Sequence, residues 1–150
     1  MALKDLRFPV PFLEAYPKKL IASGQPEPDN EYNANRNAAP RQRVDEVTGL
    51  RQWKLTCMDP SETNPKRSAV QVIFLADVAP IPAGVEIGDG VHFIELEGLT
   101  LQPKVSGQGE FKSLGWTVRA TGIKGDTSGA KLPPVEAPAS RPARSDKAVA

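Results

Sequence analysis

Two side chains in this sequence have the functional groups of a nucleophile and its base. Cys57 is a thiol and His92 an imidazole, and each residue type occurs only once in the chain. Nucleophilic catalysis needs the thiolate form next to a base. Cys57, however, lies in an alternating apolar pattern that is typical of an inert thiol in a protein core. We therefore expect no catalysis from this pair, and we expect the double variant Cys57→Ser/His92→Gln to keep its biological activity.

A second candidate is a pair of carboxylates. Glu95 and Glu97 are two residues apart in an expected strand, so their side chains share one face, as a two-carboxylate acid–base or metal site requires. Asp89 is the one further carboxylate nearby, and its GDG setting is typical of a turn. Oxygen-rich metal sites need more ligands than this. The sequence thus predicts no metal, no cofactor and no enzyme, and a hydrolase that uses these glutamates is the weakest alternative.

Four cations form a more promising group. Lys54 and Arg119 lie on the polar phases of two expected strands, and Arg43 and Arg51 flank the turn before the first of these strands. Together they could form a cationic surface that contacts phosphates. Solubilising charge scattered over the surface is the alternative, because 19 basic residues face 18 acidic ones in the whole chain. These four residues are the predicted nucleic-acid-binding site.

The elements that must position these residues are expected to be strands. Fifteen prolines and twelve glycines interrupt the chain too often for long helices. Strand patterns cover residues 50–58, 68–76, 91–105 and 114–122, and a weaker one covers 18–24. Apolar positions change phase within 91–105, and a bulge or bend at Gly98 would restore them to one face. The connection over 77–90 has room for one helical turn at most.

These strands predict a mainly β domain. Closure removes unpaired edges, so a small antiparallel barrel of the oligonucleotide-binding type is the leading expectation, with a β-sandwich as the alternative. The strand phases place two tryptophans in the core, which favours packing over base stacking for both. The predicted core consists of Trp53, Leu55, Val72, Phe74, Ile94, Leu96, Trp116 and Val118.

Composition divides the chain into three parts. Residues 1–17 are read as an N-terminal extension and 18–124 as the β domain, with a long Asn-rich loop over 24–43. Residues 125–150 are rich in Pro, Ala and Ser and poor in large apolar side chains, so a disordered tail is expected. One cysteine allows no internal disulfide, and no apolar run reaches signal-peptide or membrane-spanning length. We expect a cytoplasmic protein without membrane contact.

Three motifs between residues 44 and 124 resemble a known family. They are a D-x-x-T-G-L-x-x-W segment that continues to an aspartate, an E-G-L-T motif and a closing R-A-T-G. The chain resembles in this respect the small actinobacterial proteins called plasmid replication, integration and excision activators. The residues concerned are Asp45, Thr48, Gly49, Leu50, Trp53 and Asp59, then Glu97, Gly98, Leu99 and Thr100, then Arg119, Ala120, Thr121 and Gly122.

The resemblance implies a regulator that switches on the replication, integration and excision of a plasmid or integrative element. It assigns a role to no single residue. One hypothesis is direct binding to DNA, either single-stranded or duplex, through the four cations. The alternative is a protein-interaction module that acts on a replication or recombination protein of the same element without touching DNA.

Overall fold

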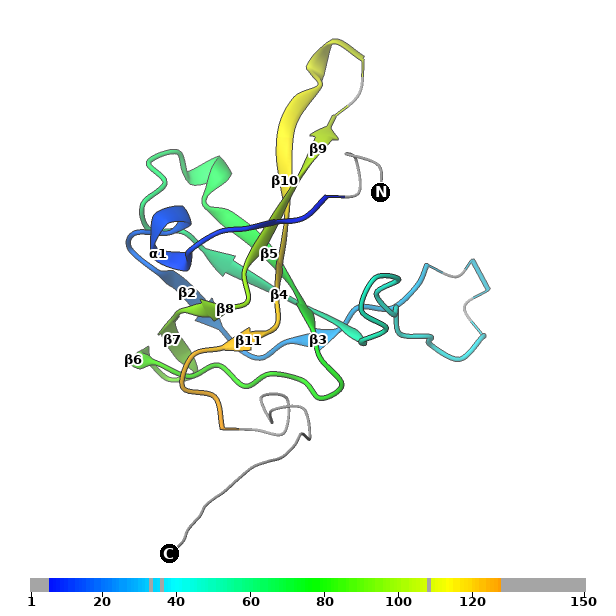
Figure 1. The fold of residues 1–150 in the computed structure, drawn as a ribbon, viewed down its shortest axis with the longest axis horizontal. Coiled ribbons are helices and arrows are strands. Elements are labelled where there is room, and N and C mark those ends of the chain that lie inside the picture. The colour runs from blue at the N-terminus through cyan, green and yellow to red at the C-terminus, as the bar shows by residue number, and fades with distance from the viewer. Residues whose placement is uncertain (1–5, 33, 36, 108, 128–150) are drawn as a thin grey trace, which may run out of the picture.

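The computed structural model describes residues 6–127 except 33, 36 and 108. Strands dominate this part of the chain, and only a one-turn helix and two short 3₁₀ turns accompany them (Figure 1). In chain order the elements are β1 (Phe8–Pro9), α1 (Phe12–Ala15), β2 (Leu20–Ser23), β3 (Glu27–Pro28), β4 (Gln52–Met58), η2 (Pro65–Arg67), β5 (Ala69–Leu75), β6 (Val85–Gly88), β7 (Val91–Ile94), β8 (Leu96–Glu97), β9 (Thr100–Ser106), η3 (Gly109–Phe111), β10 (Ser113–Ala120) and β11 (Gly122–Ile123). The prediction of a mainly β domain is confirmed.

Most of the strands form one twisted sheet in the order β1-β9-β10-β5-β4-β2-β7-β6, with β3 added to β4. The four strong strand patterns of the sequence correspond to β4, β5, the segment from β7 to β9, and β10. Their β-branched and aromatic residues suit a pleated, half-buried surface. Strand β2 is the weaker pattern over 18–24, so that expectation is confirmed as well.

The expectation that all strands pair antiparallel is wrong for one central pair. β10 runs parallel to β5, with Val118 opposite Val72 and Ala120 opposite Phe74. Parallel neighbours need a long crossover connection, and the chain between β5 and β10 provides one through β6, β7 and β9. The sheet is therefore mixed. Periodicity indicates which face of a strand is buried but contains nothing about the direction of its neighbour.

The sheet does not close into a barrel through the described residues. Its hydrogen-bonded path ends at β1 on one side and at β6 on the other. β7 and β9 belong to one chain segment, in which β7 pairs with β2 and β9 pairs with β10. A β-sandwich would need two sheets of similar size, whereas the second sheet here contains only β8 and β11.

Gly98 separates β8 from β9 and produces the bend that the sequence predicts. Its φ is +64°, and a Cβ at this position would come within 2.2 Å of the Thr121 Oγ1 atom. Glycine is thus required both by the left-handed backbone and by close packing. On either side of the bend, Ile94, Leu96 and Leu99 are all buried. The phase change at Gly98 therefore keeps both halves of the segment on the core.

The core lies on one face of the sheet. Among the predicted core residues Leu55, Val72, Phe74, Ile94, Leu96 and Val118 are buried, and Trp53 is half-buried against them. The sequence predicts a domain boundary at residue 18. However, Phe12 in α1 and Tyr16, which directly follows α1, are both part of this core. Their rings lie 5.6 Å apart. Residues before 18 therefore pack on the sheet.

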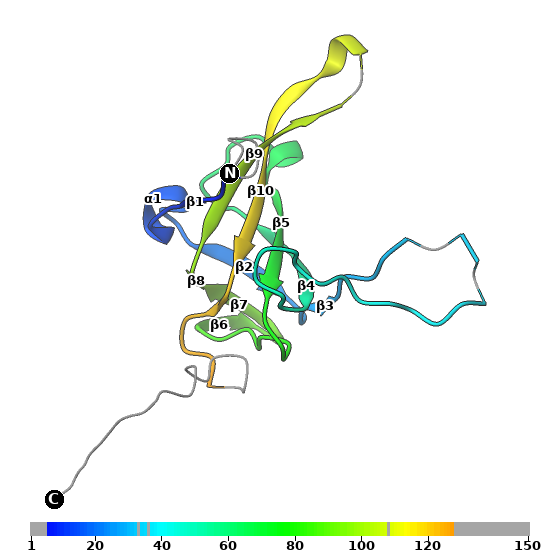
Figure 2. The same cartoon turned by 45° about the vertical axis from the view of Figure 1, so that its right-hand side comes forward.

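Trp116 is the one predicted core residue that lies on the surface, and 48% of it is exposed. Its phase in β10 is the apolar one, as expected, but the ends of β9 and β10 project beyond the sheet (Figures 1 and 2). No other element in the described part of the chain covers the hairpin there. The prediction for Trp116 is wrong because alternation identifies a face without showing how far the core extends.

The Asn-rich loop is anchored at its base. β3 pairs with β4, and an isolated bridge joins Asn30 to Gln42. Between them the chain extends away from the sheet in both views (Figures 1 and 2). The expected disordered tail lies, from residue 128 on, outside the described residues.

Candidate functional site

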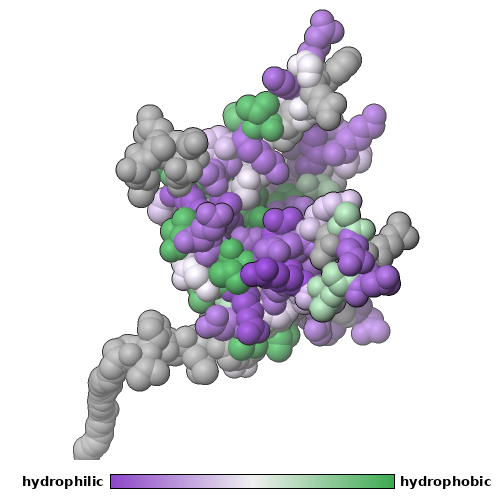
Figure 3. Space-filling model, turned by 90° about the vertical axis from the view of Figure 1, so that its right-hand side faces the viewer, coloured by the Kyte–Doolittle hydropathy of each residue, from purple (hydrophilic) through white to green (hydrophobic). Residues whose placement is uncertain are grey.

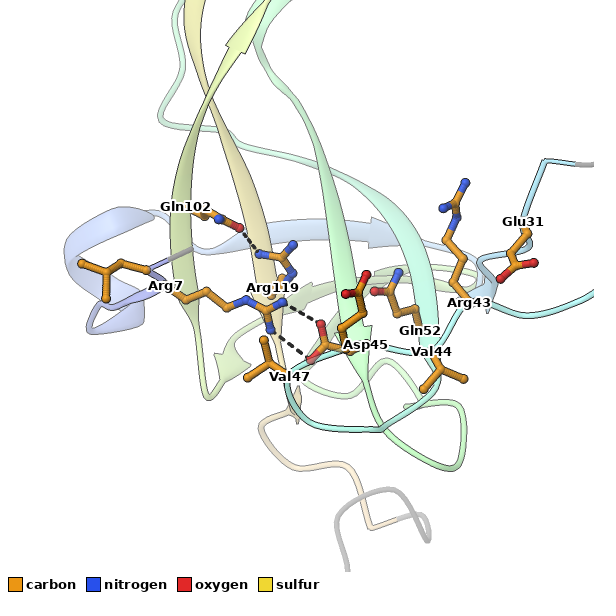
Figure 4. A pocket seen from close by; sticks show the side chains of 11 residues that line it. Arg7, Glu31, Arg43, Val44, Asp45, Val47, Gln52, Gln102 and Arg119 are labelled. Atoms are coloured by element: carbon orange, nitrogen blue, oxygen red, sulfur yellow. Dashed lines mark hydrogen bonds and ion pairs between the residues drawn. The ribbon is translucent and has the colours of Figure 1, made fainter. Parts of the chain in front are cut away.

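A cleft of about 840 Å³ opens where the N-terminal segment meets the turn before β4 and the polar face of β9 and β10 (Figure 4). Segments that are far apart in the sequence supply its walls. Figure 3 shows that the side of the molecule from which the Asn-rich loop projects is mainly hydrophilic. The residues that line the cleft are Leu6, Arg7, Glu31, Arg43, Val44, Asp45, Glu46, Val47, Gln52, Gln102 and Arg119.

The turn before β4 is organised around a buried carboxylate, that of Asp45. Its Oδ2 atom accepts hydrogen bonds from the backbone N–H and the hydroxyl of Thr48, at 2.9 and 2.8 Å. Its backbone carbonyl accepts from Gly49 N, and Gly49 has a φ of +74°, which favours glycine. Asx-type bonding of this kind is what the D-x-x-T-G motif predicts. The motif therefore shapes the rim of the cleft.

Asp45 also forms a bidentate ion pair with Arg7. The two guanidinium nitrogens Nη1 and Nη2 donate to Oδ2 and Oδ1, at 3.0 and 2.6 Å. Burial alone would raise the pKa of Asp45, but the hydrogen bonds from Arg7 and Thr48 and the charge of Arg7 lower it to about 2. Fork-shaped pairs of this kind are among the stronger charge-assisted contacts. The pair fastens the N-terminal segment across the cleft.

Arg119 lines this cleft with a hydrogen-bonding capacity that is only partly used. Its Nη1 donates to Gln102 Oε1 at 2.7 Å, while its buried Nε has no hydrogen-bond partner within the described part of the chain. Burial lowers the pKa of Arg119, as does the positive charge of Arg7, whereas Asp45 opposes this effect. A guanidinium remains charged in proteins. The Nε of Arg119 is thus a buried donor that no described residue satisfies.

The four predicted cations do not all meet in this cleft. Arg43 and Arg119 line it, and the Arg43 Nε lies 3.7 Å from the Asp29 Oδ1 atom. Lys54 lies outside the cleft lining, but it shares a cross-strand row with Arg119, with Ile73 of β5 between them. Arg51 is exposed at the start of β4, on the phase of Trp53 and away from that row. Strand phase thus brings Lys54 and Arg119 to one face of the sheet, and Arg51 lies elsewhere.

Sequence reasoning missed the contributions of Arg7, Gln102 and Asp45. Arg7 lies in the segment read as an extension, and nothing in its surroundings in the sequence indicates a partner 38 residues away. The acidic side chains also matter for the charge of the cleft. Three arginines face three carboxylates among the lining residues, so the cleft is formally neutral as a whole.

The thiol and the imidazole considered as a catalytic pair lie on separate strands. Cys57 is opposite Ala22, and Ala22 is opposite His92, so two strand spacings, roughly 10 Å, separate their backbones. Burial raises the pKa of the Cys57 thiol to about 12, which disfavours the nucleophilic thiolate at neutral pH. These features fit a core thiol, as expected for this strand.

The paired glutamates are engaged differently from each other. Glu95 has two ammonium partners, with Lys19 Nζ at 3.2 Å and Lys124 Nζ at 3.9 Å. The backbone carbonyl of Glu97 accepts from the amide of Thr121. Within residues 6–127, as far as they are described, no group of three or more His, Cys, Asp or Glu side chains could hold a metal ion. The lysines give Glu95 a structural role that ties the two ends of the domain together.

Comparison of the chain with family models, with curated proteins and with solved structures gave no match. Among the described residues, no helix has both the length and the apolar character needed to cross a membrane.

Proposed function

We propose that this protein regulates the replication, integration and excision of a plasmid or integrative element by binding nucleic acid on the polar face of its sheet. The motif resemblance over residues 44–124 supports the biological role. The observation that carries the binding proposal is the row formed by Lys54, Ile73 and Arg119, which aligns a cation of β4 and a cation of β10 on either side of β5. Cations of this kind position a protein on the phosphate backbone.

The order of the strands supports an oligonucleotide-binding type of fold. β2, β4, β5, β10 and the segment 91–106 follow one another as five strands around a partly open ring, with β5 parallel to β10 and the last segment bent at Gly98. In folds of this type, nucleic acids bind on the face of the second and third strands and on two flanking loops. Here those elements are β4, β5, the Asn-rich loop and the β9–β10 hairpin. Lys54 lies on the second strand of this set.

The cleft contributes Arg119 and Arg43 to the same surface. Arg7 forms an ion pair with Asp45, so we assign it a structural role: it holds the N-terminal segment against the turn before β4. Since the cleft as a whole is formally neutral, we expect binding to depend on a few close phosphate contacts. Long-range attraction contributes little at a net charge of +1. The affinity should therefore be modest and should fall steeply with salt.

A salt titration of DNA binding tests this proposal. Single-stranded and duplex oligonucleotides are titrated with the full chain at several salt concentrations, and the slope of log K against log salt is measured. Lys54→Gln and Arg119→Gln should each weaken binding to all sequences and reduce the magnitude of the slope by about one unit per lost contact. Arg67→Gln is the matched control, because Arg67 is an exposed cation on η2 outside the row.

The outcome distinguishes the two functional hypotheses. If neither form of DNA binds at low ionic strength, or if both row variants behave like Arg67→Gln, direct nucleic-acid binding is wrong. The protein-interaction module would then be the better proposal. The acidic lining residues Glu31 and Glu46, which repel phosphates, are the observation that keeps this alternative open.

A further inference from the structure

The distal half of the β9–β10 hairpin is the most exposed apolar surface of the sheet. β1 accompanies β9 only at Thr100 and Leu101, and β5 accompanies β10 only from Val118 onward. Beyond these points, among the described residues, the two strands pair only with each other, and neither outer edge has a strand beside it. The hairpin extends away from the sheet in both ribbon views (Figures 1 and 2).

One face of this distal hairpin is uniformly apolar. Val105 lies directly opposite Leu114, and Pro103 lies directly opposite Trp116. Val105 is 71% exposed, Leu114 67% and Trp116 48%. In the space-filling view a hydrophobic cluster is visible on the projecting part among hydrophilic side chains (Figure 3). The four positions continue the core-facing phase of the same strands, so a core-like face extends into solvent.

A hairpin of this kind is unlike an ordinary loop. Two strands without a third strand or a covered apolar face are at best marginally stable in water. Scattered apolar residues on a surface need no explanation, but an aromatic and two aliphatic side chains in adjacent cross-strand pairs form a contiguous patch. The patch would be stabilised by a surface that covers it.

The charges around the hairpin decide which kind of surface fits. The four apolar positions include no charged side chain; Lys104 lies opposite Gly115 on the other face, and the exposed Lys112 directly precedes β10. Arg119 and Gln102 are also on that other face. A nucleic-acid strand bound along the cations would therefore not reach Trp116 from the same side. The apolar face calls for an uncharged apolar partner.

A second copy of this chain provides such a partner. Two-fold pairing is the commonest arrangement of homo-oligomers, and it requires a patch that is complementary to itself. An uncharged apolar face meets this requirement, since no like charges are brought together. The net charge of +1 adds little general repulsion between copies. A tryptophan beside aliphatic side chains is also a typical centre of a protein–protein interface.

We infer that the chain forms a two-fold dimer in which the apolar faces of two distal β9–β10 hairpins pack against each other. Trp116 and Leu114 of each copy supply the centre of the contact. The cation row with Lys54 and Arg119 stays free on the outer face of each copy. The inference stands on the hairpin alone and does not depend on the proposed binding of nucleic acid.

The oligomeric state of the full chain tests the inference. Light scattering after size exclusion, and sedimentation over a range of concentrations, should give the mass of a dimer that dissociates on dilution. Leu114→Glu places a carboxylate in the apolar face and should weaken the dimer roughly 30-fold or more, as the loss of an interface hot spot does. Because Leu114 is exposed in the single chain, this variant should still fold, as circular dichroism would show.

Val85→Glu is the matched control, because Val85 is 61% exposed on the edge strand β6 and should leave the dimer unchanged. A monomer at every concentration overturns the inference. Equal dissociation of Leu114→Glu and Val85→Glu also overturns it, because the contact would then lie elsewhere. A monomer in which Trp116→Ala abolishes oligonucleotide binding would identify the face as a base-stacking surface instead. Failure of the DNA proposal, by contrast, appears in the DNA titration of the unmodified chain or of the Lys54 and Arg119 variants, and not in the oligomeric state.

Discussion

Within β9 and β10 the same alternation of apolar and polar residues continues from a buried half into an exposed half. In the proximal half Val118 and Ala120 are at most 5% exposed, because β5 and the rest of the sheet lie beside them. In the distal half Leu114 and Trp116 have the same phase, yet no element between residues 6 and 127, as far as these are described, covers them. The comparison teaches that strand phase specifies a face, whereas burial depends on the elements that arrive from elsewhere in the chain.

Substitution of Gly98 should have the largest effect on the buried half of the hairpin strands. The bend at Gly98 lets the residues on both sides of it in segment 91–106 face the core. Gly98→Ala combines a strained left-handed backbone with a Cβ that would overlap Thr121. We expect it to lower the free energy of unfolding by about 3 kcal/mol or more, as measured by urea denaturation. The proximal packing of β9 would be lost first.

Gly90→Ala is the control for this change. Gly90 has a similar φ of +73°, but a Cβ there would meet nothing within 4 Å. It should cost only the conformational part, about 1 kcal/mol. Equal effects of the two substitutions would show that Thr121 yields and that packing at the bend is unimportant.

The two tryptophans sharpen the comparison directly. Trp53 packs against the core, and its indole N–H donates to the Ala76 carbonyl at 2.8 Å. Trp53→Ala should therefore destabilise the fold by about 2–3 kcal/mol, somewhat less than for a fully buried tryptophan. Trp116→Ala should change the stability of the single chain by less than about 1 kcal/mol. Thermal and urea unfolding at low protein concentration would measure both, and a large loss for Trp116 would mean that its face is covered within the monomer.

Asp45 gives a smaller effect that depends on pH. Its pKa is about 2 in the folded chain and about 3.8 in its ordinary state, so the unfolded chain binds more protons between these values. The ion pair with Arg7 therefore contributes its full stability above pH 3.8, and this contribution of about 1–2 kcal/mol is lost as the pH falls toward 2. Urea unfolding at a series of pH values would measure it.

Asp45→Asn should remove this contribution at neutral pH and lower the free energy of unfolding by about 2 kcal/mol, because Arg7 loses its partner. Glu46→Gln is the neighbouring control, since Glu46 is exposed on the same turn. If the two variants had the same stability and the same pH dependence, the Arg7–Asp45 pair would not fasten the N-terminal segment.

Much of the strand framework was predictable because it depends on local patterns. Alternation identified β4 and β10, a run of apolar residues identified β5, and the phase change in 91–105 predicted the bend at Gly98. The D-x-x-T-G motif predicted the turn at Asp45, because its hydrogen bonds join residues three or four positions apart. In each case the physical cause lies within a few residues of the effect.

The cleft was only partly predictable, because some of its contacts join residues that are far apart in the sequence. Strand phase placed Lys54 and Arg119 on one face, but it could not reveal that Arg7 would reach Asp45 across 38 residues. Alternation does place Arg51 and Lys54, three positions apart in one strand, on opposite faces, so of these two only Lys54 could share a face with Arg119. Contacts between distant segments depend on the path of the whole chain.

The sequence by itself determined the β class, the positions of the main strands, the glycine bend and the turn before β4, because side-chain alternation and backbone freedom act over short distances. Only the tertiary structure decided that β5 and β10 run parallel, that Asp45 is buried against Arg7 and that Trp116 is exposed. These outcomes depend on which strands become neighbours and on where the sheet ends. Such choices are made by the packing of the whole chain around one core, which no local pattern contains.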